Sequence, residues 1–274
     1  MSDVVLYEAA GPIATITLNR PDKLNAINGE VIDQLGKHVA RAAADDAVKV
    51  LLIAGNGRAF SAGFDMTDEI EDGTETPLDW HPVLRRDADL TMSIWACPKP
   101  TIAVVQGYCL GGGCEIAMAC DLIVAADDAQ FGEPEILYGS GPVTLLMPFI
   151  LGQKKTNELL LTGDRITAEE ALTSGLVNKV VARDDLAAAA HALARRIAPT
   201  PLPVLRLTKL ALNRAYEAMG LRVAVDANIE ISAMINGANT PEQQEFDKVA
   251  AEQGLKAALA WRDQRYEDAE DCGG

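Results

Sequence analysis

The stretch that decides the fold is residues 98–135, PKPTIAVVQGYCLGGGCEIAMACDLIVAADDAQFGEPE. Thr101–Val105 is an apolar run with β-branched residues, a pattern that predicts a buried strand. It leads into Gly111–Gly113, and a helical pattern then continues to Cys120. Three consecutive glycines let the backbone approach a ligand closely, because no Cβ stands in the way.

The start of this predicted helix offers one site for chemistry. The first amides of a helix have no partner inside it, and the helix dipole adds positive charge there, so the turn can hold an anion or an oxyanion. Glu115 follows Gly112 by three residues, which places its carboxylate on the same side as those amides. The alternative is that the glycines only permit tight strand–helix packing and that Glu115 is a first-turn charge.

Two further carboxylates close the stretch. Pro134 suits the first position of a helix, so Glu133 and Glu135 lie near its positive end. A capping role without chemistry fits Glu133. It fits Glu135 less well, because the apolar Ile136 and Leu137 that follow predict a partly buried setting.

Composition limits the function classes. The 274 residues are 49% hydrophobic and 23% charged, as in a soluble globular protein. A formal net charge of −16 argues against nucleic acid and anionic membranes as partners. Five cysteines fit a reducing compartment, and we find neither an export signal nor an apolar run of membrane-spanning length. We therefore expect a cytoplasmic protein.

The rest of the chain divides into two parts. The first alternates strands and helices, and everything beyond Gly141 has a helical pattern, which predicts an α/β core followed by a C-terminal helical domain, divided near residue 199. Residues 66–80 are acidic and predict a mobile surface segment before a helix over 82–96. Other predicted helices are Gly29–Ala44 (capped by Asn28), Val143–Leu151, Lys154–Leu161, Ala168–Ser174, Asp185–Ala198, Pro203–Ala218, Leu221–Asn236, Pro241–Gln253 and Leu255–Tyr266.

The common catalytic motifs are absent. The sequence has no P-loop, no G-x-S-x-G elbow and no paired-cysteine zinc pattern, and its glycine cluster lacks the dinucleotide-binding spacing. Only three histidines occur. A Ser–His–Asp triad and a metal site are therefore not expected, and the carboxylates remain the candidates for acid–base work.

Several segments together resemble the crotonase superfamily, the enoyl-CoA hydratases and isomerases. The resemblance extends from about Val4 to Arg262. The matching segments are residues 59–65 (AFSAGFD), 107–115 (GYCLGGGCE), 22–27 (DKLNAI), 120–121 (CD), 131–135 (FGEPE), 163–168 (GDRITA), 175–178 (GLVN) and a lysine-bearing helix around Lys209.

This resemblance implies a crotonase-like spiral of ββα units over 1–199 and a C-terminal α-helical trimerisation region over 200–274. It implies an acyl-CoA thioester substrate, no cofactor other than the coenzyme A of that substrate, and trimers or pairs of trimers. In such proteins two N–H groups, which would be those of Phe64 and Gly112, bind the thioester oxygen. The residues that would line the CoA path are Lys23, Leu24, Ala26, Ala62, Gly63, Asp65 and Gly111.

The resemblance also implies a reaction. Family hydratases carry a glutamate pair at positions matching Glu115 and Glu135, and syn hydration of a 2-enoyl-CoA would divide water activation and α-proton delivery between them. The sequence departs from the family over 137–148, where many hydratases have a glycine-rich segment, and at Phe64, where alanine is frequent. Double-bond isomerisation, C–C cleavage, thioester hydrolysis and non-catalytic acyl-CoA binding therefore stay open, as does the acyl group.

Overall fold

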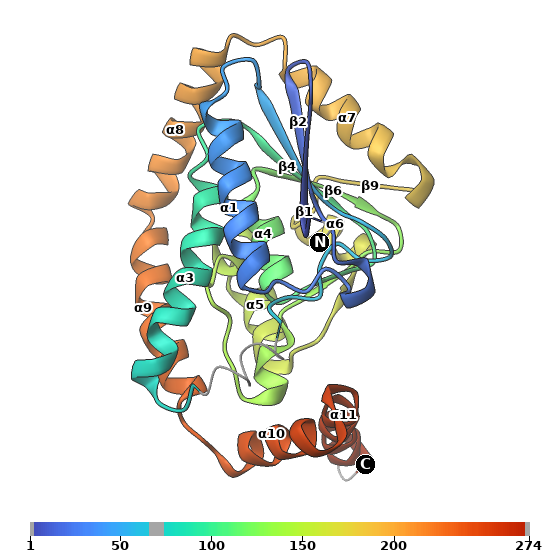
Figure 1. The fold of residues 1–274 in the computed structure, drawn as a ribbon, viewed down its shortest axis with the longest axis vertical. Helices are drawn as coiled ribbons and strands as arrows, with labels where there is room; N and C mark the ends of the chain where they lie inside the picture. Colours follow the sequence, from blue (N-terminus) through green and yellow to red (C-terminus); the bar gives the residue numbers. More distant parts are fainter. Residues whose placement is uncertain (1–2, 66–73, 272–274) are drawn as a thin grey trace.

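The computed structural model describes residues 3–65 and 74–271 (Figure 1). Its strands are β1 (Val5–Ala10), β2 (Ile13–Leu18), β3 (Val50–Gly55), β4 (Thr101–Val105), β5 (Tyr108–Leu110), β6 (Leu122–Ala126), β7 (Gln130–Gly132), β8 (Ile166–Thr167) and β9 (Lys179–Val181). Its helices are α1 (Gly29–Ala44), α3 (Pro77–Trp95), α4 (Gly112–Ala119), α5 (Met147–Thr162), α6 (Ala168–Ser174), α7 (Leu186–Ile197), α8 (Leu202–Ala218), α9 (Leu221–Asn236), α10 (Pro241–Gln253) and α11 (Leu255–Asp271). Short 3-10 turns are η1 (Pro21–Lys23), η2 (Pro134–Tyr138) and η3 (Arg183–Asp185).

The larger sheet has the strand order β1-β2-β3-β4-β6-β9. The β1–β2 hairpin is antiparallel, and each later neighbour is parallel, with Ile16 opposite Ile53 and Ala103 opposite Ile123. Parallel strands need crossover connections and are buried on both faces. The apolar runs of β3, β4 and β6 meet that requirement.

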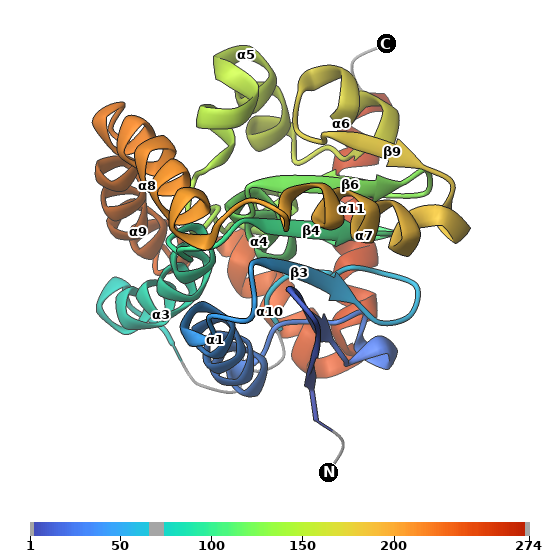
Figure 2. The same cartoon turned by 90° about the horizontal axis from the view of Figure 1, so that it is seen from above.

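Helices cover both faces of this sheet (Figure 2). Alternate residues face opposite sides: Val50 and Leu52 pack toward the alanine-rich α7, whereas Leu51 and Ile53 pack toward α1, α3 and α4. The Asn28 side chain accepts the N–H of Val31 and so begins α1, as predicted. The sheet is therefore the middle layer of the core.

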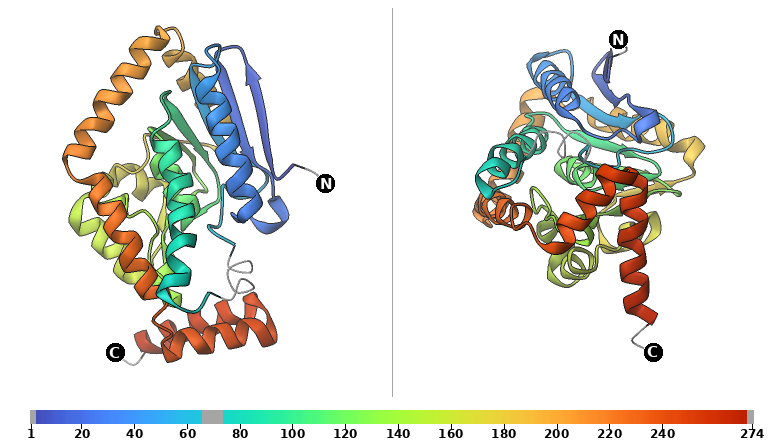
Figure 3. Two further views of the ribbon diagram at one scale, coloured as in Figure 1. Left: turned by 60° about the vertical axis from the view of Figure 1, so that its left-hand side comes forward. Right: turned by 60° about the horizontal axis from the view of Figure 1, so that its bottom comes forward.

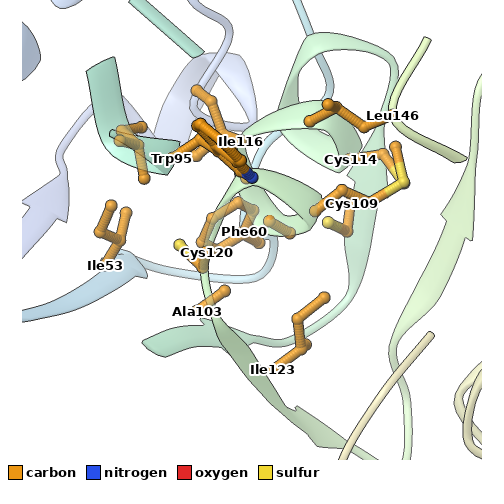
Figure 4. Packing of buried hydrophobic residues seen from close by; sticks show 14 of the residues in the cluster. Ile53, Phe60, Trp95, Ala103, Cys109, Cys114, Ile116, Cys120, Ile123 and Leu146 are labelled. Atoms are coloured by element: carbon orange, nitrogen blue, oxygen red, sulfur yellow. The ribbon is translucent and has the colours of Figure 1, made fainter. Parts of the chain in front are cut away.

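Helix α4 lies at the centre of the larger apolar cluster. All of its residues are buried. Ile116 packs among Trp95, Phe60 and Leu146, and Cys114 lies beside Cys109 of β5 (Figure 4). The glycine turn that precedes α4 is therefore held between the sheet and the surrounding helices.

A smaller sheet, β5-β7-β8, supports that turn. Strands β5 and β7 are parallel, and the Gly111 N–H donates to the Gly132 carbonyl. The strand that ends in the glycine turn and the strand that leads to η2 therefore finish side by side.

The C-terminal helices form two pairs (Figure 3). Helix α9 runs along α3 and α8 packs against α9, and the buried Lys209 of α8 forms an ion pair of 2.7 Å with Asp121. Helices α10 and α11 pack on each other and against η2. The turn that carries Glu135 thus has a C-terminal helix against it.

Two expectations from the sequence are wrong. The region beyond Gly141 is not all helical, because β8 and β9 occur there and β9 completes the larger sheet. The third helix begins at Pro77, not Pro82, because Thr76 and Asp79 form a capping box that starts it earlier. Residues 77–80 therefore belong to α3 and not to the predicted surface segment. Residues 66–73 of that segment lie outside the described part of the chain.

Candidate active site

The glycine turn adopts a conformation that other residues rarely reach. Gly111 has φ +51° and Gly63 has φ +101°. A Cβ on Gly63 would lie 3.0 Å from the Leu110 carbonyl oxygen and 3.4 Å from the Gly112 nitrogen. Glycine is therefore required in both segments, for its backbone freedom and for the close approach.

Two backbone N–H groups lie beside this turn. Gly112 is the first residue of α4, so its N–H has no carbonyl partner within the helix. The Phe64 N–H makes no hydrogen bond to the described residues. The bridge between Phe64 and Ile27 is formed instead by the backbone groups of the residues before and after Phe64. The Phe64 ring lies against Gly112, where a Cβ would come within 2.3 Å of it. The two residues that carry the N–H groups predicted for the thioester oxygen are therefore in contact.

The segment that carries Phe64 is fixed by its neighbour in space. The Ala62 N–H donates to the Leu24 carbonyl and the Ile27 N–H to the Gly63 carbonyl. On its other side, the Ser61 and Leu110 amides join this segment to β5. Leu24, Ala26 and Ala62, predicted to line the CoA path, are thereby brought together.

Side chains that sequence reasoning missed hold this arrangement. Asn25, 1% exposed, donates to the carbonyls of Asn56 and Ala59 and accepts the Arg20 N–H. The Arg20 guanidinium donates to the Ala26 carbonyl and to Asp65. The Asp65 carboxylate is therefore engaged with Arg20. The signal in the sequence that could have identified Asn25 is its place in the matched segment 22–27 (DKLNAI).

Glu115 is buried at the start of α4. Its Oε1 accepts the N–H groups of Val143 and Thr144, at 2.6 and 3.1 Å. Its Oε2 has no hydrogen-bond partner among the described residues. Burial raises the pKa of Glu115, and the hydrogen bonds from Thr144 and Val143 oppose that rise only in part. One oxygen is thus fixed while the other is available to a reacting molecule.

Glu135 faces the glycine turn from η2. It is half-buried, as predicted. A Cβ on Gly111 would lie 2.3 Å from Glu135 Oε1. The carboxyl group therefore lies directly against the turn that presents the Gly112 N–H.

Glu133 does not cap η2, so the capping interpretation is wrong. Its side chain forms no capping hydrogen bond and is 1% exposed. Neither of its carboxyl oxygens has a partner among the described residues. Burial raises the pKa of Glu133 well above its ordinary value, and the charges of Glu115, Cys114 and Glu135 raise it further. The site therefore holds three carboxyl groups, not two.

The other predicted CoA-path residues differ in exposure. Lys23 and Ala62 are exposed, Leu24, Ala26 and Asp65 are half-buried, and Gly63 and Gly111 are buried in the turns. A separate cavity of about 340 Å³ lies at the other end of α4, lined by Trp95, Asp121, Phe149 and Tyr216 among others. None of the three glutamates lines that cavity, so it is not the site of the acids.

Two kinds of feature do not occur within residues 3–65 and 74–271. No cluster of three or more His, Cys, Asp or Glu side chains could hold a metal ion there. In the same residues, no helix combines the length and apolar character needed to cross a membrane.

Comparison with known proteins identifies the family. A family model described as enoyl-CoA hydratase/isomerase matches residues 8–253. The chain belongs to this family. A probable enoyl-CoA hydratase of Mycobacterium bovis is 37% identical over 220 residues, which are 79% of this chain and 83% of that protein. A short-chain-enoyl-CoA hydratase of Clostridium acetobutylicum is 34% identical over 78% of this chain and 82% of its own length.

A solved structure of an enoyl-CoA hydratase/isomerase from Xanthobacter autotrophicus Py2 has the same fold. Its TM-score is 0.93 at 44% identity, covering 96% of this chain and 98% of that one. The predicted crotonase-like α/β fold with C-terminal helices is therefore confirmed. The site described above belongs to a member of the enoyl-CoA hydratase/isomerase family.

Proposed function

We propose that the protein is an enoyl-CoA hydratase that adds water across the 2,3 double bond of an enoyl-CoA thioester. The observation that carries this proposal is the pairing of Glu115 and Glu135 at one glycine turn. Relatives named as enoyl-CoA hydratases support it. Hydration neither oxidises nor reduces the substrate, so we propose no cofactor beyond the coenzyme A of the thioester itself.

The first element of the mechanism is an oxyanion hole. Attack at the β-carbon pushes an electron pair onto the thioester oxygen and forms an enolate. We assign the Phe64 and Gly112 N–H groups to that oxygen, aided by the positive end of α4. Loss of one such donor typically costs about 3 kcal/mol of transition-state stabilisation.

The second element is a pair of acids with different environments. Glu115, held by two amides through Oε1, takes the proton of the attacking water through Oε2. Because burial raises the pKa of Glu115, its carboxylate is a stronger base than an exposed one. Glu135 gives its proton to the α-carbon from the same face, which yields a 3-hydroxyacyl-CoA by syn addition. Atoms balance, since one water enters and the proton count of the two acids is unchanged.

Glu133, as a neutral group, is compatible with this division of roles between Glu115 and Glu135. Three neighbouring carboxyl groups cannot all ionise at low cost, because each charge opposes the others. The raised pKa of Glu133 keeps its carboxyl group protonated, so the negative charge of the site is left to the base.

The CoA moiety would follow the surface formed by Lys23, Leu24, Ala26, Ala62, Gly63, Asp65 and Gly111. The exposed Lys23 ammonium suits the phosphates, and the small Ala26 and Ala62 leave room for the pantetheine chain. The ion pair of Arg20 with Asp65 would fix the shape of that surface.

We also propose self-association, as a trimer or a pair of trimers. Helices α8 and α9 expose many large apolar side chains, more than a monomer usually leaves in contact with water. They are Val204, Leu207, Leu210, Leu212, Tyr216, Val223, Ile231, Met234 and Ile235. A cytoplasmic location is proposed as well, supported by four buried cysteines that are free thiols, Cys97, Cys109, Cys114 and Cys120.

A panel of enoyl-CoA thioesters tests the proposed activity. Loss of the enone absorbance, with formation of the 3-hydroxyacyl-CoA, is expected. Double-bond migration without water uptake would instead make the protein an isomerase, the other activity in the family description. Binding of CoA thioesters with no reaction would contradict both.

A further inference from the structure

Helix α10 contacts the turn that carries Glu135. The ring of Phe246 stacks on Tyr138, the last residue of η2, with ring centroids 5.9 Å apart. Phe246 is 2% exposed and packs in a small apolar cluster formed by α10, α11 and Tyr138. The C-terminal helix pair is therefore joined to the wall of the active site.

One side chain of α10 makes the polar part of this contact. The Gln243 amide nitrogen donates to the Gly139 carbonyl and, at 3.0 Å, to the Ile235 carbonyl. Its oxygen accepts the Thr240 N–H at 2.7 Å, which completes the capping box of α10. Every hydrogen-bonding direction of this amide except its second acceptor site is used, so its orientation is fixed by the network.

The contact is also close. Gly139 has φ +82°, and a Cβ there would lie 2.5 Å from Gln243 Cγ. The next residue, Ser140, donates its N–H to the Glu135 carbonyl at 3.0 Å and its hydroxyl to Asn236 at 2.8 Å. The backbone that Gln243 holds is therefore hydrogen-bonded directly to the backbone of Glu135.

We propose that Gln243 is a positioning residue for Glu135, which acts by fixing the Gly139–Ser140 turn against α10. The far end of this connection is the Glu135 carboxyl group, which faces Gly111. A shift of the turn moves the acid relative to the α-carbon, and a displacement of about 1 Å can lower a rate 10²-fold. The C-terminal helix pair thus contributes to catalysis besides any part in assembly. This inference rests on the proposed role of Glu135 as the proton donor.

The variant Gln243→Glu separates the two jobs of this side chain. A glutamate at this position keeps the capping box, since its carboxylate still accepts the Thr240 N–H. It cannot donate to Gly139 and Ile235, whose carbonyl oxygens it would repel. Gln243→Met, uncharged and of similar length, loses the same two donors without adding a charge, and it also loses the acceptor for the Thr240 N–H. A fall in kcat common to both variants is therefore due to the lost hydrogen bonds to Gly139 and Ile235, not to the charge or the cap. Gln244→Glu is the matched control, because the Gln244 side chain donates to the Asn239 carbonyl and, within residues 3–65 and 74–271, makes no hydrogen bond to η2 or Gly139.

The decisive measurement is a double-mutant cycle with Glu135→Gln, read as kcat and KM for crotonyl-CoA. Both Gln243 variants should lower kcat about tenfold with KM changed less than about twofold, while Gln244→Glu stays at the wild-type value. In the Glu135→Gln background, Gln243→Glu should have no further effect, because both changes act through one acid.

Two results would overturn parts of the account separately. If Glu135→Gln lowers kcat and Gln243→Glu lowers it again by the same factor, Gln243 does not act through Glu135, and the inference is wrong. If Glu135→Gln is as active as the wild type, the proposed role of Glu135 itself is wrong. A kcat unchanged in both Gln243 variants would also refute the inference.

Discussion

Replacing Glu133 by glutamine should make the stability of the protein less sensitive to pH. Glu133 is 1% exposed, and burial together with the charges of Glu115, Cys114 and Glu135 raises its pKa well above 4.5. The folded protein therefore keeps this proton at a pH where the unfolded chain has lost it. Stability then falls as pH rises above the unfolded pKa, until the folded pKa is passed.

The size of this effect follows from linkage. While the folded state keeps the proton and the unfolded state has lost it, each pH unit costs about 1.4 kcal/mol. Glutamine carries no proton that can be lost, so the difference in unfolding free energy between Glu133→Gln and the wild type should shift in favour of the variant by up to about 2.7 kcal/mol between pH 5 and pH 7. Only the pH dependence of this difference tests the claim, because burial of the glutamine amide adds a cost in unfolding free energy that does not change with pH.

Urea unfolding at fixed protein concentration, repeated from pH 5 to pH 7, measures the slope. Glu8→Gln is the control, since Glu8 is an exposed glutamate of β1, and its difference from the wild type should stay flat. If the Glu133→Gln difference is equally flat, Glu133 is already ionised in the folded protein at pH 5. The description of a neutral third acid would then be wrong.

Three other changes have defined outcomes. Gly111→Ala should lower kcat at least about 10²-fold, because the added Cβ would displace Glu135 Oε1. Gly220→Ala is the control: Gly220 also has a positive φ, but an added Cβ would have no atom within 4 Å, so this variant should lose stability and keep kcat. Asn25→Ala should cost about 1–3 kcal/mol of unfolding free energy in urea titrations and raise KM, since two carbonyls lose their buried donor; an unchanged KM would separate this loop from the CoA path. Leu207→Glu on α8 should reduce the mass measured by light scattering, and Leu78→Glu on α3, at a position that is more exposed still, should not. Equal effects would remove α8 from the proposed interface.

The local elements were predictable where one signal dominates. In α1 the Asn28 cap and the apolar positions Val31, Leu35, Val39 and Ala42 agree, and all four of these residues are buried in the structure. The central strand and α4 were predicted from residues 101–119 for the same reason. Sequence is sufficient there because local propensity and burial specify the same element.

Elements whose pairing comes from distant parts of the chain were not predictable. Strand β9 has three residues and exists only because β6 offers it an edge, so no periodicity could reveal it. The sequence position of Glu133 suits a cap, whereas its burial close to Glu115 and Cys114 of α4 comes from the tertiary fold. Gln243 carries the ordinary signature of a capping box, and only the fold shows what else it contacts.

The most direct test of the central claim compares hydration of crotonyl-CoA by the wild type, Glu115→Gln and Glu135→Gln, with folding verified by thermal unfolding. The account predicts that the wild type consumes the enone and forms the 3-hydroxyacyl product, and that each variant loses about 10²–10⁴-fold in kcat while remaining folded. A folded variant of either glutamate that hydrates crotonyl-CoA at the wild-type rate would contradict the account.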